Sequence, residues 1–228
     1  MKVIVYVEGN SDKFAMEQLF KQVIENKQNQ GIEIQFFSGK GKDNQRGGNA
    51  KKELLEVIPK KAINILTGNP NSIVVVIPDL YPKNIGFPHT TYDELKAGII
   101  NQFEQELTKK GIEDHRLKQR FKVFCYKYDL EALVLASETQ LKTRLCLRKD
   151  QNFPISWTIP VEDQNHDQPP SRIVERLFKA YNKNYQKTVD STLILGQAHY
   201  QDIAERCPQC FKPFVEFLEN LSLPQEDL

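Results

Sequence analysis

The sequence has 228 residues, of which 39% are hydrophobic, and its 31 basic and 30 acidic residues give a net charge of +1. This length and composition predict one sizeable globular core with room for a smaller annex. A net charge so close to zero excludes a uniformly basic surface, so any contact with nucleic acid must come from local patches.

No stretch of the sequence approaches the roughly 20 apolar residues of a membrane span. Glu8 interrupts the apolar start of the chain too early for a signal peptide. We therefore expect a cytoplasmic protein that has no contact with a membrane. Four cysteines are too few for a disulfide framework in a chain of this length, and the cytosol would keep them reduced; they are Cys125, Cys146, Cys207 and Cys210.

The first half of the chain alternates strand-like runs with amphipathic helical patterns. In chain order we expect a strand at 3–7, a helix at 14–24, a strand at 32–37, a helix at 54–66, a strand at 73–77, a helix at 95–107 and a strand at 121–126. Pro59 predicts a kink in the second helix. Strands joined by crossover helices run parallel, so their carboxyl ends meet at one edge of the sheet.

Beyond residue 136 the pattern becomes helical. Apolar residues recur at helical spacing in four segments, which are 141–147, 173–181, 203–207 and 211–221. A stretch rich in Pro, Asp and Gln separates the first segment from the others. The sequence therefore predicts an α/β domain over residues 1–136, with a mostly parallel sheet flanked by helices, and a helical extension over residues 137–228 that packs on it.

Acidic residues follow three of the predicted strands. Glu8 follows the first strand, Asp79 the third, and Asp129 and Glu131 the fourth. Carboxylate oxygens suit Mg²⁺ or Mn²⁺, and such a metal can polarise a phosphodiester and orient an attacking water. The sequence thus predicts a metal site for phosphodiester hydrolysis at this edge, with Glu8 and Asp79 as the catalytic residues.

Each acid also has a simpler interpretation. A single acid at a strand end is often only solvated, so the metal site depends on the coincidence of several. Glu131 precedes an apolar run that would draw it toward the core, and we rank it above Asp129 as a ligand. Asp12 falls in the first turn of the first helix, where an acid usually interacts with the helix dipole, and we leave it out of the site.

The motif Val7-Glu-Gly-Asn-Ser-Asp12 resembles the first motif of the TOPRIM fold, the metal-binding domain of topoisomerases, bacterial primases, ribosomal-RNA maturases and overcoming-lysogenization-defect nucleases. Asp79-Leu-Tyr81 matches the position of its second motif. A longer resemblance points to a TOPRIM-like family of uncharacterised proteins that includes the small component of AbiL-type phage abortive-infection systems. It rests on Asp79-Leu-Tyr-Pro82, Gly86-Phe-Pro88, Tyr128-Asp-Leu-Glu-Ala-Leu133, Pro170-Ser-Arg-Ile173, Tyr181-Asn-Lys183 and Ile203-Ala-Glu-Arg-Cys-Pro208.

This resemblance implies a TOPRIM-like metal-binding domain over residues 1–136 and cleavage of DNA or RNA. The chain departs from the family pattern at one place. The second motif usually carries two aspartates, and Tyr81 stands where the second aspartate is expected. A two-metal site would then need Asp129 or Glu131 as a substitute. Tyr81 has two open interpretations, which are contact with a phosphate or base and simple packing at the strand end.

A basic, glycine-rich loop follows the second strand. Its phosphate-binding candidates are Lys40, Lys42 and Arg46, with Lys51 and Lys52 just beyond. A solvated loop is the alternative, and the loop lacks the ending of a nucleotide-binding P-loop. Cys207 and Cys210 form half of a zinc pattern, for which buried packing is the preferred interpretation.

Two classes of function follow from these patterns. The first is an Mg²⁺- or Mn²⁺-dependent nuclease of a phage-defence system, with Glu8 and Asp79 at its centre. The second is a non-catalytic or conditionally active subunit that binds nucleic acid or docks a partner ATPase, a partner suggested by the family resemblance to two-component defence systems. The incomplete second motif and the lack of a P-loop motivate the second, which is the alternative to the nuclease.

Overall fold

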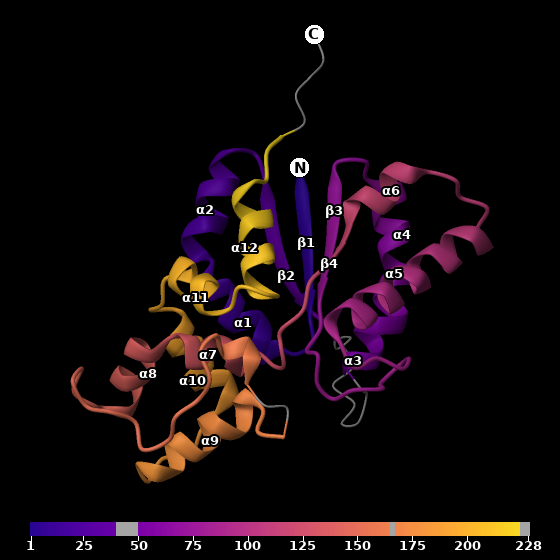
Figure 1. Cartoon of the computed structure of the whole chain (residues 1–228). Helices are drawn as coiled ribbons and strands as arrows, with labels where there is room; N and C mark the ends of the chain where they lie inside the picture. Colours follow the sequence, from indigo (N-terminus) through magenta and orange to yellow (C-terminus); the bar gives the residue numbers. More distant parts are fainter. Residues whose placement is uncertain (40–49, 165–166, 224–228) are drawn as a thin grey trace.

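A four-stranded parallel sheet with the order β2-β1-β3-β4 forms the centre of the molecule (Figure 1). The computed structural model describes residues 1–39, 50–164 and 167–223. Its strands are β1 (Lys2–Val7), β2 (Glu33–Ser38), β3 (Ser72–Ile77) and β4 (Phe121–Val123). In the register of the sheet, Val5 of β1 lies between Phe36 of β2 and Val75 of β3. The predicted α/β class, with a parallel sheet flanked by helices, is confirmed.

The fourth strand is shorter than the sequence predicts. The regular ladder between β3 and β4 stops at Val123, and only an isolated bridge pairs Asp79 with Tyr126. Backbone bonds lie on both sides of the break, from the Phe124 N–H to the Val76 carbonyl and from the Leu80 N–H to the Tyr126 carbonyl. The missing bond between them would need an N–H from Pro78, and proline has none to donate.

Helices cover both faces of the sheet (Figure 1). One face carries α4 (Ile58–Gly68), α5 (Tyr92–Lys109) and α6 (His115–Arg120), and the other carries α1 (Asn10–Leu19), α2 (Lys21–Asn29) and α12 (Phe211–Glu219). Side chains alternate between these two cores along each strand: in β3, Val75 and Ile77 join the core of α1 and α12, and Val74 and Val76 join the other. The single helix predicted at 14–24 is interrupted at Phe20.

The helix predicted at 54–66 begins earlier and changes its geometry before Pro59. It consists of α3 (Ala50–Lys52), a π-helical turn η1 (Glu53–Val57) and α4. Pro59 lies in the first turn of α4, where its missing N–H removes one backbone bond of the preceding turn. The kink predicted at Pro59 stays a prediction; the structure has a π turn immediately before α4.

The C-terminal part is helical, as predicted, but it contains one more long helix than the sequence suggests. It follows α7 (Glu131–Ala136), and its elements are α8 (Glu138–Leu145), the short 3-10 turn η2 (Val161–Asp163), α9 (Pro170–Ala180), α10 (Lys187–Leu195), α11 (Tyr200–Arg206) and α12. Helix α10 was not predicted from the sequence. Its apolar Val189 and Leu193 are exposed, whereas its polar Asp190 and Ser191 are buried. This breaks the apolar periodicity on which helix prediction depends.

One hydrophobic core joins the sheet to the C-terminal helices. It contains Val3 and Val5 of β1 together with Leu177 of α9, Leu195 of α10 and Leu218 of α12. The division of the chain into residues 1–136 and 137–228 stays a prediction. Within the described ranges, no helix combines the length and the apolar character that crossing a membrane requires.

Candidate active site

The first two acids predicted for the site are in direct contact. Glu8 directly follows Val7, the last residue of β1, and Asp79 lies two residues beyond the end of β3. The Asp79 N–H donates a hydrogen bond of 3.1 Å to Glu8 Oε1. Parallel pairing of β1 with β3 in register brings the two strand ends together, as the sequence analysis predicts.

The acids that follow β4 lie in the same region. Asp79, Asp129 and Glu131 line one open cleft of about 420 Å³. Glu131 begins α7 and is only 2% exposed, and the Tyr185 hydroxyl donates to its Oε1 at 3.2 Å. Asp129 is also buried, and its Oδ2 accepts a 3.2 Å bond from the Ser171 N–H. The structure therefore brings the four predicted acids to the carboxyl edge of the sheet.

Asp12 belongs to this cluster, although its place in the first turn of a helix predicted only an interaction with the helix dipole. Its Oδ2 accepts a 2.9 Å bond from the Gly9 N–H at the start of α1, which agrees with the expected role near the helix dipole. Yet Asp12 is buried, on the same helix face as Ala15, Met16 and Leu19. That spacing of three, four and seven residues was the signal in the sequence for a buried acid.

Lys187 was not predicted from the sequence as a residue of this site. It is the first residue of α10, and its ammonium lies 3.0 Å from Asp12 Oδ1 and 3.5 Å from Glu131 Oε2. Burial alone would lower the pKa of Lys187, but the attraction of Asp79, Glu131 and Asp12 raises it above its usual value. Lys187 is therefore a permanent positive charge among the carboxylates, and it lines the same cleft.

Burial opposes the ionisation of these acids. Burial raises the pKa of Glu8 to about 7, an effect that Lys51 opposes and Asp12 reinforces. Burial likewise raises the pKa of Glu131 to about 7 and that of Asp79 well above its usual range. In the described part of the chain, buried Oδ1 atoms of Asp79 and Asp129 have no hydrogen-bond partner. Such groups are unfavourable unless a cation or donor joins them.

The cluster is not arranged as a finished metal site. Among the residues that the structure describes, no group of three or more His, Cys, Asp or Glu side chains is in place to hold a metal ion. Among the described residues, Cys207 and Cys210 are likewise not part of such a group. Both are buried and carry free thiols. Their packing agrees with the preferred interpretation of that half-motif.

Lys51 has a different environment from the basic loop to which the sequence assigns it. It is buried, and its ammonium donates to the Leu80 carbonyl at 2.9 Å and also to the Pro82 carbonyl. Burial lowers its pKa to about 8, against the attraction of Glu8 and Asp79. Lys51 therefore fixes the backbone just beyond Asp79. The phosphate-binding candidates Lys40, Lys42 and Arg46 lie outside the described residues.

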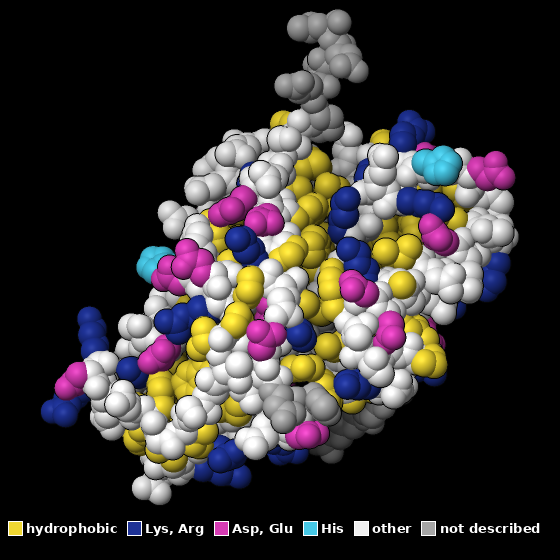
Figure 2. All heavy atoms as spheres, viewed as in Figure 1, with side chains coloured by type: hydrophobic (Ala, Val, Ile, Leu, Met, Phe, Trp, Pro, Cys, Tyr) yellow, Lys and Arg dark blue, Asp and Glu magenta, His cyan; other side chains and the backbone are white. Residues whose placement is uncertain are grey.

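Tyr81, which stands where a second aspartate is usual, lines the acidic cleft and is half-buried. Its ring meets the Tyr128 ring edge to face at 5.2 Å, and the Lys83 ammonium lies 5.6 Å from its centroid. Tyr81 therefore lies at the border of the site and is not a fully buried core residue. Elsewhere on the surface, basic and acidic side chains intermingle over the face that Figure 2 shows, as the net charge predicts.

The fold and the site define an α/β protein with a buried acidic cluster at the carboxyl edge of a parallel sheet, where such folds bind their ligands. The chain belongs to the family described as "Domain of unknown function (DUF4276)", whose model matches residues 7–219. A comparison with curated protein sequences gave no match.

Among solved structures, the chain is similar to the C-terminal regions of two OLD proteins. The C-terminal region of the Burkholderia pseudomallei OLD protein shares 15% identity over 96% of both chains, with a TM-score of 0.44. The corresponding region of the Xanthomonas campestris pv. campestris OLD protein shares 12% identity over 95% of both chains, with a TM-score of 0.42. Similarity at this level leaves the activity to be argued from the residues of this chain.

Proposed function

We propose that this protein is a nuclease that hydrolyses phosphodiester bonds of DNA or RNA with the help of Mg²⁺ or Mn²⁺. The observation that carries the proposal is the cleft in which Asp79 and Asp129 each keep a buried oxygen without a hydrogen-bond partner among the described residues. Glu8 and Asp79 are the proposed catalytic acids. The TOPRIM-like motifs of the sequence support the same assignment.

The residues present fit a hard cation. All candidate ligands are carboxylates, namely Glu8, Asp79, Asp129 and Glu131. Burial raises the pKa of each of them, and a bound cation would favour their ionised forms. Because no three of them are in place at once, we propose that side chains rearrange when the metal binds. Bound there, Mg²⁺ would polarise the phosphodiester and stabilise developing negative charge.

Residues around the acids have supporting roles in this proposal. Lys187 presents a permanent positive charge to the cleft, where it would attract a phosphate group. Tyr185 holds Glu131 in orientation through its hydroxyl. Lys51 fixes the segment that carries Asp79, through the Leu80 and Pro82 carbonyls. Two of these three residues come from the C-terminal helical part, which therefore completes the site.

A second candidate function is a subunit that works with a partner protein, such as an ATPase in a phage-defence system. The observation that favours it is the exposure of Val189 and Leu193 on α10, each 45% exposed although apolar. Both lie on the helix that delivers Lys187 to the acids. A partner bound to α10 would thereby touch the element that carries a charge of the site.

Cleavage assays with the purified chain test the main proposal. Single- and double-stranded DNA and RNA are incubated with Mn²⁺, Mg²⁺ or EDTA, and the variants are Glu8→Gln and Asp79→Asn. We expect metal-dependent cleavage that falls at least about 100-fold in both variants. Glu25→Gln, an exposed acid on α2, is the matched control and should cleave normally. Unchanged cleavage by Asp79→Asn, or no cleavage of any substrate, would refute the nuclease.

Calorimetric titration with Mn²⁺ provides a readout that is independent of activity. The unmodified chain and Glu25→Gln should bind the ion, and Asp79→Asn should bind it at least about tenfold more weakly. A protein that binds no Mn²⁺ but is retained by a partner from its own operon, in a manner lost in Leu193→Asp, would establish the subunit function instead.

A further inference from the structure

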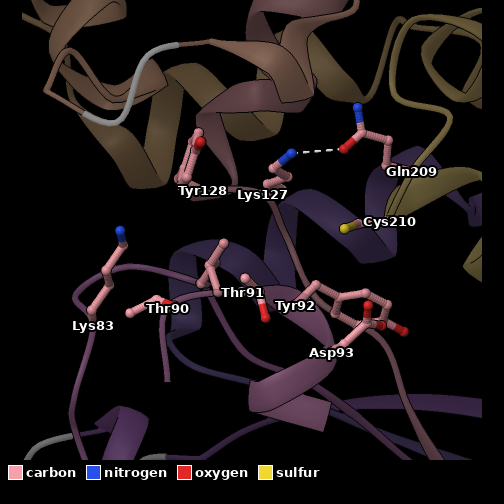
Figure 3. A pocket seen from close by; sticks show the side chains of 10 residues that line it. Lys83, Thr90, Thr91, Tyr92, Asp93, Lys127, Tyr128, Gln209 and Cys210 are labelled. Atoms are coloured by element: carbon pink, nitrogen blue, oxygen red, sulfur yellow. Dashed lines mark hydrogen bonds between the residues drawn. The ribbon is translucent and has the colours of Figure 1, made fainter. Parts of the chain in front are cut away.

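A second pocket lies beside the acidic cleft. The acids of the cluster do not line it, and these are Glu8, Asp12, Asp79, Asp129 and Glu131. It has a volume of about 570 Å³, within the range of sites that enclose small ligands. Figure 3 shows Lys83 and residues 90–93 on one side, and Lys127, Tyr128 and Gln209 on the other. The exposed acid Asp93 lies at the end of the pocket away from Lys83 (Figure 3).

Two tyrosines form the boundary between the pocket and the cleft. Tyr81 lines the acidic cleft and Tyr128 lines the second pocket. Their rings meet edge to face at 5.2 Å, and the Tyr81 N–H donates a 3.1 Å bond to the Tyr128 carbonyl. Because both residues are half-buried, each ring keeps surface available to a ligand. A molecule that crossed this boundary would touch both sites.

An ammonium group borders each ring. Lys83 Nζ lies 5.6 Å from the Tyr81 centroid, and Lys127 Nζ lies 5.9 Å from the Tyr128 centroid. The Lys127 ammonium also donates to Gln209 Oε1 at 2.7 Å, as the dashed line in Figure 3 marks. In the described ranges, neither lysine forms an ion pair with a carboxylate. Both charges are therefore available to an anionic ligand.

Aromatic faces next to cations match the chemistry of a nucleotide unit. A base stacks on an aromatic ring, and ammonium groups neutralise the phosphates on either side of it. A base inside a duplex is already stacked on its neighbours and cannot reach such a ring. Two lysines also neutralise few phosphates, far fewer than the basic stripe by which proteins usually grip duplexes.

The geometry points to a binding subsite for single-stranded nucleic acid, in which an unstacked base lies against Tyr128 and the adjoining phosphates lie near Lys127 and Lys83. The subsite would hold the strand across Tyr81 with a neighbouring phosphodiester in the acidic cleft. This inference rests on the proposed nuclease function and specifies its substrate as a single strand. DNA and RNA share this chemistry, and the experiment separates them.

Binding is measured by fluorescence anisotropy in EDTA, so that no cleavage occurs. The probes are labelled poly-dT, labelled poly-U and a blunt DNA duplex of equal length. We expect a single strand to bind more tightly than the duplex. Tyr128→Ala should weaken single-strand binding by about 5- to 150-fold, the range for loss of one base–aromatic stack, and Tyr128→Phe should preserve it. Preference for poly-dT or poly-U identifies the natural strand.

Salt dependence tests the two lysines. Each phosphate contact on a single strand contributes about 0.7 to the slope of log affinity against log salt, so Lys83→Ala and Lys127→Ala should each lower the slope by about that amount. Phe14→Ala removes another aromatic ring bordered by a lysine, Lys13 at 5.5 Å, and Lys109→Ala removes a charge at the opposite end of α5. Neither control should change the affinity or the slope.

Different results would refute the nuclease and the single-strand subsite. Equal binding by Tyr128→Ala and the unmodified chain, tighter binding of the duplex, or no binding would overturn the subsite even if metal-dependent cleavage occurs. Binding that depends on Tyr128 without any cleavage would refute the nuclease and leave the subsite in place. Thermal unfolding of each variant, compared with the unmodified chain, establishes that a loss of binding is not a loss of fold.

Discussion

Replacing Glu131 by Gln should stabilise the metal-free protein at alkaline pH. Glu131 is almost fully buried, and burial raises its pKa to about 7, with Lys187 acting in the opposite direction and Asp129 in the same one. A carboxyl whose pKa is higher in the folded state than in the unfolded state binds more protons when folded. Its contribution to stability is complete below the unfolded pKa of 4.5 and is lost as the pH rises through about 7.

The size of the effect follows from this shift. A tenfold change in an ionisation equilibrium corresponds to about 1.4 kcal/mol, so ionising Glu131 at pH 8 opposes folding by on the order of 3 kcal/mol. Glutamine removes the charge and keeps an oxygen for the Tyr185 hydroxyl. Its amide would face the Lys187 ammonium, which offsets about 1–2 kcal/mol of the gain. The expected net stabilisation at pH 8 is about 1–2 kcal/mol, or about 2–8 °C in Tm for a chain of this size.

Thermal unfolding in EDTA between pH 5 and pH 8 measures this difference. At pH 5 the folded protein carries Glu131 protonated, so Glu131→Gln should be no more stable than the unmodified chain. Glu25→Gln is the control for an exposed glutamate and should leave Tm unchanged at both values. A Glu131→Gln variant that is less stable at pH 8, or a difference independent of pH, would refute the reasoning, because Lys187 would then more than compensate the buried charge.

Three further predictions concern other parts of the same site and fold. Lys51→Met should lower the free energy of unfolding by about 1–3 kcal/mol in urea titrations, because two backbone carbonyls lose their buried donor. Gly98→Ala should lower it by a similar amount, since the new Cβ would lie 2.1 Å from the Phe87 ring, whereas Gly68→Ala, with nothing within 4 Å, should not. Mn²⁺ should raise the Tm of the unmodified chain, and that rise should disappear in Asp79→Asn.

The sequence predicted the sheet well because its strands carry strong local signals. Residues 3–7 and 73–77 are continuous runs made almost entirely of β-branched residues, and both are central strands of the observed sheet. Once these strands are parallel, the neighbouring positions of Glu8 and Asp79 follow from topology alone. The early end of β4 was not predicted because it depends on Pro78, which follows the neighbouring strand β3. This is a property of the strand pairing and not of the segment itself.

The positive charge of the site was not predictable in the same way. Lys187 reaches the acids because α10 packs against α1, and this contact joins residues about 175 positions apart in the chain. Periodicity describes only the local face of a helix, and α10 exposes its apolar Val189 and Leu193. Asp12 was within reach of sequence reasoning, since it shares a face with Ala15 and Leu19, but the helix dipole offered a sufficient local explanation for an acid at that place.

The position of Lys187 also explains how a cluster of buried acids can exist before any metal binds. Its ammonium contacts Asp12 of α1 and Glu131 of α7, so one cation offsets part of the repulsion across the site. Removing it should leave buried carboxylates that protonate or repel each other, which is strongly destabilising. Lys187→Met should therefore lower stability at pH 8 far more than at pH 5, and Mn²⁺ should restore more of it than in the unmodified chain. If Mn²⁺ stabilises both proteins equally, the lysine and the metal do not act on the same carboxylates.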